Sequence, residues 1–456
     1  MNDPNGLVFH DGEYHLFYQH NPFGDTWGHM SWGHAVSPDL LHWSHLPVAL
    51  REDQEGMVFS GSAVVDWTNT SGLAGGDSAR PCLVAVYTGH SPGRQTQNLA
   101  YSNDRGRTWT KYAGNPVVDL GLAAFRDPKV VWHAATGRWI MLTVLADRHV
   151  VRFFSSPDLK HWDVLSDFGP EGATGGVWEC PDLFALGVED EPSVSRWVLS
   201  VDLNPGGTAG GSGGQYFVGA FDGTRFVNEH PAGVPLWVDH GRDFYASLSY
   251  SDIPARDGRR IWIGWMSNWA YANQEPTSPW RGVQSVPRAL ALRRLPEGIR
   301  LVQRPVAELE TLRVSAEPEA VKGSMPLPPA AEIAFEVTPG PWREAGLSLR
   351  NSAGERVEIG VAQDPLHAFV DRRNSRLTPF HESYPERHSG PVRWRNGRVS
   401  MRILTDATTV EVFANGGETV ISDRLHPTHP FETVEMLDGG VGHPSPPRMW
   451  TLRPAG

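Results

Sequence analysis

Three acidic motifs in the first half of the chain contain residues that could act as a nucleophile or as an acid and base. The first is Asn2-Asp3-Pro4-Asn5-Gly6, in which a proline and an Asn-Gly turn fix the carboxylate of Asp3 just before a predicted β-hairpin over residues 7–18. A carboxylate held at the start of a strand is a candidate nucleophile. An aspartate in this position can also simply cap a turn, so the motif alone leaves both interpretations open.

The other two motifs place acids in different surroundings. Phe125-Arg126-Asp127-Pro128 puts a cation beside a second Asp-Pro pair, which favours the ionised carboxylate. Trp178-Glu179-Cys180-Pro181-Asp182 puts a glutamate between an aromatic ring and a thiol, and we expect such apolar surroundings to raise its pKa. An ionised nucleophile, a protonated acid and a third carboxylate that holds a sugar suit cleavage of a glycosidic bond. Each Asp-Pro pair alone could merely shape a turn.

A repeated motif indicates how these acids are positioned. Ser37-Pro38-Asp39-Leu40-Leu41-His42-Trp43 returns almost unchanged as Ser156–Trp162, with variants at residues 102–109 and 221–226. The aromatic residues that close the four copies are 66, 53 and 64 residues apart, and short strand-like runs such as 129–133 fill the intervals. Several short strands per period are typical of propeller blades. Residues 1–300 therefore predict a five-bladed β-propeller.

The pattern changes after residue 300. Residues 301–313 have apolar spacing that favours a short linker helix. Alternating runs such as 333–337 and 399–404 follow, separated by turns such as Asn415-Gly416-Gly417. Residues 314–456 therefore predict a β-sandwich. The predicted fold class is all-β, a five-bladed β-propeller followed by a C-terminal β-sandwich.

Composition excludes several classes of partner. The 456 residues carry a net charge of −12, which argues against nucleic-acid binding because that requires a basic face. The sequence contains no run of about 18 apolar residues, so we expect no membrane span. Two cysteines, Cys82 and Cys180, cannot form a dense disulfide framework. No convincing set of metal ligands occurs, so we expect neither metal nor cofactor. The oligomeric state stays open.

The position of Asp3 bears on localisation. A catalytic loop at residue 3 would lie where chain ends ordinarily fray, so we expect natural sequence upstream of Met1. With such a segment a secreted or cell-surface protein is favoured, and without it a cytoplasmic one.

The motifs together resemble those of a known family. Glycoside hydrolase family 32, which contains the β-fructofuranosidases, inulinases and levanases, has motifs similar to Asn2–Gly6, Phe59–Ser62, Phe125–Pro128 and Glu179–Asp182. Patterns of its C-terminal domain resemble Val370–Arg373 and Thr409–Phe413, so the resemblance covers nearly the whole chain. It implies a five-bladed propeller with the site in its central funnel, joined to a β-sandwich.

The resemblance also implies roles. Asp3 would attack the anomeric carbon of a fructosyl unit, Glu179 would be the general acid and then the base, and Asp127 would bind sugar hydroxyls as a stabiliser. This is a retaining double displacement through a fructosyl-enzyme intermediate. Six residues match positions that line the family's first subsite: Asn2, Gln19, Trp27, Phe59, Ser60 and Arg126. We also expect Asn268 and Trp280 to bind substrate.

The implied substrate is a fructan. Residues 265–272, 276–281 and 204–207 look more like exo-acting fructanases than sucrose-phosphate hydrolases. We therefore expect release of terminal fructose from β-2,1 or β-2,6 fructans, with sucrose as a second substrate. A sucrose-specific invertase, a fructosyltransferase and a catalytically impaired fructan-binding protein stay open. A sialidase would need an arginine cluster of which Arg126 is the one obvious member, and a family 43 arabinanase would not explain Asn2–Gly6.

Overall fold

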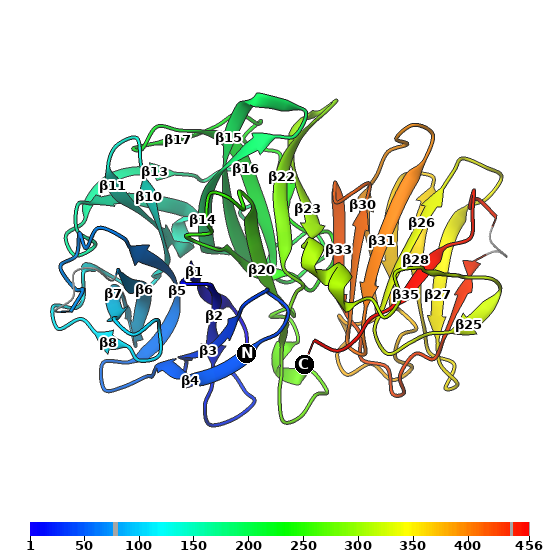
Figure 1. Ribbon diagram of the computed structural model, residues 1–456, viewed down its shortest axis with the longest axis horizontal. Coiled ribbons are helices and arrows are strands. Elements are labelled where there is room, and N and C mark those ends of the chain that lie inside the picture. The colour runs from blue at the N-terminus through cyan, green and yellow to red at the C-terminus, as the bar shows by residue number, and fades with distance from the viewer. Residues whose placement is uncertain (76–80, 438–440, 456) are drawn as a thin grey trace.

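The computed structural model describes residues 1–75, 81–437 and 441–455 and consists mainly of β-strands in two domains (Figure 1). The first domain, coloured blue to green, lies on the left of Figure 1, and the second, yellow to red, lies on the right. None of the helices in the described part of the chain is both long and apolar enough to cross a membrane. The predicted all-β class is confirmed.

The first domain begins with three antiparallel sheets in chain order. The first sheet contains β1 (Pro4–His10), β2 (Glu13–His20), β3 (Ser31–Ser37) and β4 (Ser44–Leu50). The second contains β5 (Met57–Asp66), β6 (Cys82–Ser91), β7 (Arg94–Ser102), β8 (Thr110–Lys111) and β9 (Val118–Leu122). The third contains β10 (Phe125–His133), β11 (Arg138–Leu145), β12 (Val150–Ser156) and β13 (Asp163–Phe168), with the short 3₁₀ helix η1 (Ala146–Arg148) after β11.

Two further groups of strands are joined where Val188 of β14 pairs with Leu292 of β22. One group contains β14 (Val177–Val188), β15 (Glu191–Asn204), β16 (Gly213–Phe221), β17 (Phe226–Asn228) and β18 (Leu236–Trp237). The other contains β19 (Tyr245–Ser249), β20 (Arg260–Met266), β21 (Val283–Gln284), β22 (Arg288–Leu295) and β23 (Gly298–Pro305), with the 3₁₀ helix η2 (Ala272–Gln274) between β20 and β21.

The last of these groups packs against the first sheet. Leu7 and Leu16 share a hydrophobic core with Leu248 and Ile261, and the backbone of Ser251 hydrogen bonds to the segment beside Val8. As a result β1, β5, β10, β14 and β19, the first strands of their groups, contact one another in succession. Strands far apart in the sequence are thereby brought side by side.

The repeated motif forms the same turn in different sheets. Oδ1 of Asp39 accepts hydrogen bonds from the backbone N–H groups of Leu41 and His42, at 3.0 and 2.9 Å, between β3 and β4. Asp158 makes the equivalent bonds between β12 and β13. An aspartate that bonds to its own following backbone stabilises a turn locally. The repeat seen in the sequence is therefore a turn between the third and fourth strands of a sheet.

A β-bulge interrupts the register of β1, β5, β10, β14 and β19, which we call the inner strands. The irregular steps lie between Asn5 and Val8, Val58 and Gly61, Arg126 and Lys129, Glu179 and Asp182, and Tyr245 and Leu248. Asp127, Cys180 and Ala246 have φ values of +62°, +48° and +53°, a left-handed conformation that is uncommon for residues with a side chain. A bulge re-aims the side chains around it, and the bulges in β10 and β14 overlap the motifs Phe125–Pro128 and Trp178–Asp182.

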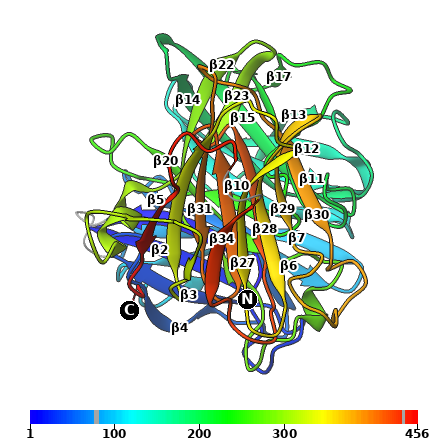
Figure 2. The same cartoon turned by 90° about the vertical axis from the view of Figure 1, so that its right-hand side faces the viewer.

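The second domain consists of two six-stranded sheets. One contains β24 (Glu319–Ala320), β35 (Arg448–Thr451), β26 (Ala331–Val337), β31 (Val399–Thr405), β32 (Thr409–Ala414) and β33 (Thr419–Arg424). The other contains β25 (Ser324–Pro326), β34 (Thr433–Met436), β27 (Glu344–Arg350), β28 (Arg356–Gln363), β29 (Leu366–Asp371) and β30 (Arg387–Pro391). Their inner faces share one core that includes Ile333 and Ile359, which is the packing of a β-sandwich. Figure 2 views these strands from the outer end of the molecule.

The segment between the domains is less helical than its sequence predicted. Leu301 and Val302 belong to β23, where they pair with β22, and the 3₁₀ helix η3 covers Ala307–Leu312 alone. The neighbouring strand β22 satisfies the backbone of residues 298–305, and Val306 N still donates to Pro287 O at 3.0 Å before η3 begins. Long-range strand pairing therefore outweighs the local helical pattern.

Buried ion pairs connect the two domains. Arg288 of β22 is fully buried and donates to Oε2 of Glu411 in the second domain, at 2.6 Å, and to Oδ2 of Asp239 at 3.1 Å. In the reverse direction, Arg372 of the second domain donates to Oδ2 of Asp243 at 2.6 Å. Charges removed from water in this way need their partners, so each domain depends on groups that the other supplies.

Candidate active site

The three acids from the sequence motifs lie together at the inner strands. Sγ of Cys180 lies 3.8 Å from Oδ2 of Asp3 and 3.8 Å from Oδ2 of Asp127, and Glu179 is the preceding residue on β14. Burial raises the pKa of the Cys180 thiol, so its S–H group faces both carboxyl groups as a neutral donor. Asp3, directly before β1, thus forms one acidic cluster with residues of β10 and β14.

Asp3 has donors on both carboxylate oxygens. The hydroxyl of Ser60 donates to Oδ2 at 2.6 Å, and the side-chain amide of Asn2 donates to Oδ1 at 3.2 Å. Burial raises the pKa of Asp3, while the hydrogen bonds from Ser60 and Asn2 act against that increase because they stabilise the charged form. These contacts orient the carboxylate, and among the described residues Asp3 forms no ion pair with a cation.

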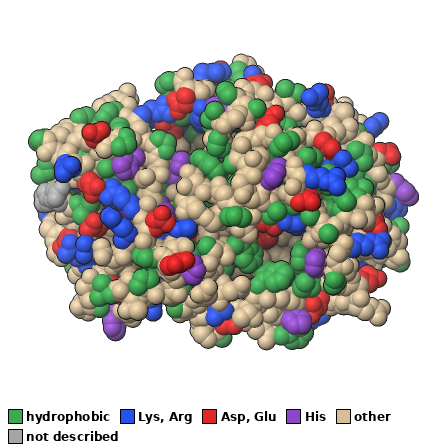
Figure 3. Space-filling model, turned by 180° about the vertical axis from the view of Figure 1, so that it is seen from behind, with side chains coloured by type: hydrophobic (Ala, Val, Ile, Leu, Met, Phe, Trp, Pro, Cys, Tyr) green, Lys and Arg blue, Asp and Glu red, His purple; other side chains and the backbone are tan. Residues whose placement is uncertain are grey.

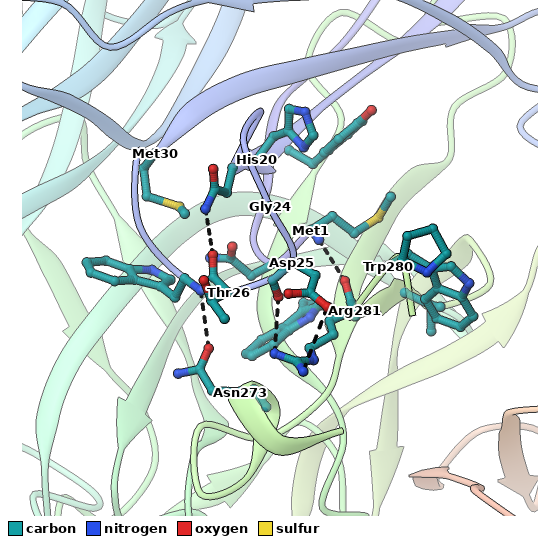
Figure 4. A pocket seen from close by; sticks show the side chains of 18 of the residues that line it. Met1, His20, Gly24, Asp25, Thr26, Met30, Asn273, Trp280 and Arg281 are labelled. Carbon is teal, nitrogen blue, oxygen red and sulfur yellow. Dashed lines mark hydrogen bonds and ion pairs between the residues drawn. The ribbon is translucent and has the colours of Figure 1, made fainter. Parts of the chain in front are cut away.

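The backbone around Asp3 is held from several sides. Gln19 N donates to Asp3 O at 3.0 Å, and Asn2 N donates to Gln19 O at 3.2 Å. The side chain of Gln284 donates to Asn2 O, and the amine of Met1 donates to Arg281 O, each at 2.7 Å; Figure 4 shows the latter. The fraying expected at residue 3 is therefore opposed by contacts with the second strand and with the last group of strands.

Glu179 has polar partners rather than the apolar surroundings expected from its motif. Nε of Arg126 donates to Oε1 at 3.1 Å, and the hydroxyl of Tyr245 donates to Oε2. Tyr245 is buried on β19, and no motif in the sequence singled it out. Its role depends on the contact between β14 and β19, which is a long-range feature. The side chain of Glu179 is therefore fixed by one cation and one neutral donor.

Asp127 differs from its expected state. The sequence predicted that Arg126 keeps it ionised, but Nε of Arg126 lies 3.8 Å from Oδ2 of Asp127 and hydrogen bonds to Glu179 instead. Burial raises the pKa of Asp127 to about 7, although Arg126 and the backbone N–H of Cys180, 3.0 Å from Oδ2, oppose the change. Desolvation therefore outweighs the neighbouring cation.

Other predicted substrate-binding residues surround the cluster. Gln19 is buried and its side-chain amide donates to Val58 O at 3.1 Å. Phe59 stacks on His90 with ring centroids 4.3 Å apart, and Trp27 meets the edge of Phe59 at 5.9 Å. The half-exposed ring of Trp27 and the ring of Phe59 form an aromatic wall beside the acids.

Asn268 occupies a different kind of position. It is fully buried, and its amide nitrogen donates to the backbone oxygens of Gly210, Ser212 and Arg242. Its Oδ1 accepts from the backbone N–H groups of Ser212 and Ala270. These bonds hold the glycine-rich loop of residues 205–212, between β15 and β16, to the end of β20. We therefore assign Asn268 to supporting that loop and not to contacting substrate.

A cavity of about 390 Å³ lies beside Asn2 (Figure 4). The three acids are not among its lining residues, but Trp27, Trp269 and Trp280 are. Arg281 holds its wall by a hydrogen bond to Asp25 O at 3.4 Å, as Figure 4 shows. The cavity therefore extends the aromatic wall away from the acids toward the segment between β20 and β21.

The family assignment comes from the whole chain. The model of the N-terminal domain of glycosyl hydrolases family 32 matches residues 1–305, and the model of the family's C-terminal domain matches residues 306–443. The chain belongs to glycoside hydrolase family 32. This confirms the resemblance seen in the motifs and the glycosidase class that they predicted.

Individual family 32 members are similar over nearly the full chain. A levanase of Bacillus subtilis (strain 168) is 47% identical over 97% of this chain, which spans 67% of the relative's own length. The crystal structure of exo-inulinase from Aspergillus awamori matches with a TM-score of 0.94 and 35% identity, covering 100% of this chain and 96% of that one. A β-fructofuranosidase from Schwanniomyces occidentalis, complexed with fructosyl-erythritol, matches with a TM-score of 0.90 and 29% identity, covering 99% and 95%.

Proposed function

We propose that this protein is a retaining exo-β-fructosidase that releases terminal fructose from β-2,1 or β-2,6 fructans and also cleaves sucrose. The observation that carries the proposal is the cluster of Asp3, Asp127 and Glu179 in a family 32 chain. Similarity to a levanase and to an exo-inulinase supports a fructan substrate. The interspersed cationic and anionic side chains on the face in Figure 3 also suit a neutral polysaccharide.

The contacts support a double displacement. In the first step, a carboxylate oxygen of Asp3 forms a bond to the anomeric carbon of fructose, the glycosidic bond breaks, and Glu179 gives its proton to the departing oxygen. In the second step, Glu179 takes a proton from water, the water oxygen bonds to the anomeric carbon, and the ester to Asp3 breaks. Arg126 and Tyr245 hold the carboxyl group of Glu179 by hydrogen bonds. A neutral Asp127 carboxyl can donate one hydrogen bond to a sugar hydroxyl and accept a second one through its other oxygen.

The aromatic cavity supports binding of a further sugar. Trp269 and Trp280 present flat apolar faces next to Asn2, and sugar rings stack on such faces. We therefore propose that this cavity accepts part of the polymer beyond the reacting fructose. A sucrose-specific invertase and a fructosyltransferase use the same intermediate, and they are the alternatives within the family.

The decisive experiment compares inulin, levan and sucrose with the purified protein. We expect fructose from all three, as the sole product from the two polymers. Activity on sucrose alone would favour an invertase, oligosaccharides longer than sucrose would favour a transferase, and binding of fructan without products would favour a binding protein.

The proposed roles of the acids have their own test. Asp3→Asn and Glu179→Gln should each lower kcat by several orders of magnitude while the protein stays folded, as a cooperative thermal unfolding transition would show. Asp222→Asn, in an exposed turn before β17, is the matched control and should keep full activity. Near-normal turnover by either site variant would contradict the assignment.

We further propose that the first domain is a five-bladed propeller that includes β23 and so extends to Pro305, beyond the boundary at residue 300 predicted from the sequence, and that residues 306–313 join it to a sandwich over 314–456. The packing of the last strands against the first sheet and the five equivalent bulges support five blades around the acids.

A further inference from the structure

A fourth carboxyl group lies behind Glu179 and has no part in the proposed reaction. Asp202 is 3% exposed on β15, directly opposite Glu179 in the register of β14 and β15. On its other side it pairs with Gly214 of β16, where an added Cβ would lie 2.3 Å from Oδ1 of Asp202. The glycine therefore makes room for this carboxyl group.

The carboxyl group of Asp202 lies beside the bulge in β19. The backbone N–H groups of Ala246 and Ser247 act on it against the rise in its pKa, and Ala246 is the residue with the left-handed φ of +53°. Bulges disrupt ladder hydrogen bonds, and the freed buried donors need other acceptors. At another bulge the same need is met in the same way, because the N–H of Cys180 donates to Asp127 at 3.0 Å.

The residue before this bulge is Tyr245, whose hydroxyl donates to Oε2 of Glu179. We propose that Asp202 is a positioning residue for the acid–base group, because it holds the β19 bulge that aims the Tyr245 hydroxyl at Glu179. The inference rests on the proposed function, since Glu179 is the acid only in that reaction.

The surroundings of Asp202 favour its neutral form. Its buried Oδ2 has no hydrogen-bond partner among the described residues, and the nearby ionisable groups are the carboxyls of Asp3 and Glu179, the thiol of Cys180 and the phenol of Tyr245. None of these is a cation, and burial raises the pKa of Asp202. A neutral carboxyl still accepts hydrogen bonds through its carbonyl oxygen, and the side chain of asparagine has an equivalent oxygen.

The test compares Asp202→Asn, Asp202→Ala and Tyr245→Phe by the pH dependence of kcat on sucrose. Asp202→Asn should keep kcat within about threefold, with the basic limb of the profile unchanged. Asp202→Ala should lower kcat by about 10- to 100-fold and move that limb to higher pH, because Glu179 loses a donor that stabilises its charged form. Tyr245→Phe should move the limb in the same direction, and adding it to Asp202→Ala should move the limb no further.

Opposite results would overturn the inference. A limb that moves to lower pH in Asp202→Asn would mean that Asp202 is ionised, and an unchanged limb in Asp202→Ala would mean that the residue only supports the fold. If Asp202→Ala does not fold, the asparagine variant still decides.

A measurement of stability separates this inference from the proposed function. A carboxyl whose pKa is raised in the folded state destabilises the protein as pH rises above its unfolded pKa. The melting temperature of Asp202→Asn minus that of the wild type should therefore increase from about pH 4.5 to about pH 7.5. A constant difference would contradict a neutral Asp202 even if the wild type released no fructose. Absence of fructose release from the wild type would instead contradict the proposed function.

Discussion

The hydroxyl of Ser60 donates a 2.6 Å hydrogen bond to Oδ2 of Asp3, the residue that we assign as the nucleophile. This bond stabilises the carboxylate against the burial that raises its pKa. A nucleophile must be ionised, so the acid limb of the activity profile should lie above the ordinary pKa of an aspartate, about 3.9.

Ser60→Ala should move this acid limb of kcat/KM to higher pH by roughly 0.5–1 unit, because one hydrogen bond to a charged group is worth about 1 kcal/mol or somewhat more. The measurement is kcat/KM on sucrose from pH 3 to 7. Ser62→Ala is the control, because that hydroxyl donates to Pro128 O and not to Asp3. A limb that stays in place, or moves to lower pH, would show that the serine does not stabilise the charged form.

Asp127 should make the wild type less stable as pH rises. Its folded pKa of about 7 lies above the unfolded value near 3.9, so its contribution is fully present below about pH 4 and is lost as pH rises through about 7. The free energy of unfolding of Asp127→Asn should therefore increase relative to that of the wild type between pH 4 and 8, by an amount on the order of 4 kcal/mol.

Urea unfolding at several pH values measures this difference. Asp222→Asn is a control of opposite sign, because backbone hydrogen bonds from Arg225 and Thr224 lower the pKa of Asp222. That variant should lose, or at most keep, stability relative to the wild type over the same range. A difference between Asp127→Asn and the wild type that does not change with pH would contradict the raised pKa.

Trp280 should matter for binding and not for bond cleavage. It is 43% exposed and lines the aromatic cavity, with the guanidinium of Arg424 5.9 Å from its ring centre. Trp280→Ala should raise KM for levan or inulin by about 5- to 20-fold, or roughly 1–2 kcal/mol, and leave kcat within about twofold.

Trp132 offers a matched control for that experiment. It is 46% exposed, but it lies on β10 away from the cavity and packs against Trp139. Trp132→Ala should leave KM unchanged for both polymers. Equal effects of the two substitutions, or a loss of kcat without a change in KM in Trp280→Ala, would remove the cavity from the substrate path.

Arg288→Met should destabilise the protein by about 3–5 kcal/mol, because it leaves Asp239 and Glu411 buried without their cation. Chemical unfolding followed by tryptophan fluorescence measures the change. The control is Arg398→Met, which breaks an exposed pair with Glu336 and should cost less than about 1 kcal/mol. A loss of similar size in both variants would mean that burial does not decide the strength of these pairs.

The sequence predicted the parts of this site that are encoded locally. Asp3 and Asp127 stand in Asp-Pro motifs and Glu179 stands beside Cys180, so residue type and spacing were sufficient to find them. Tyr245 and Asp202 could not be found in this way, because their proximity to Glu179 depends on the register between strands distant in sequence. Asn268 was predicted to bind substrate because its motif resembled the family, and its burial is visible only in three dimensions.

The same distinction applies to the fold. The turn formed by Asp39 and Asp158 is local, so its repeat revealed the succession of sheets. The apolar spacing of residues 301–305 predicted a helix. The structure pairs this segment with β22 instead, and nothing in the local sequence indicates that pairing. The bulges were also missed, since a bulge is defined by two strands together and not by one.

The ion pairs between Arg288 and Glu411 and between Arg372 and Asp243 have a consequence for how the molecule comes apart. Separation of the two domains would break these ion pairs and expose their buried charges to water. Heating should therefore give a single calorimetric transition, with fructose release and sandwich structure lost together. The stability of the sandwich would then limit the temperature at which the first domain keeps its active site folded.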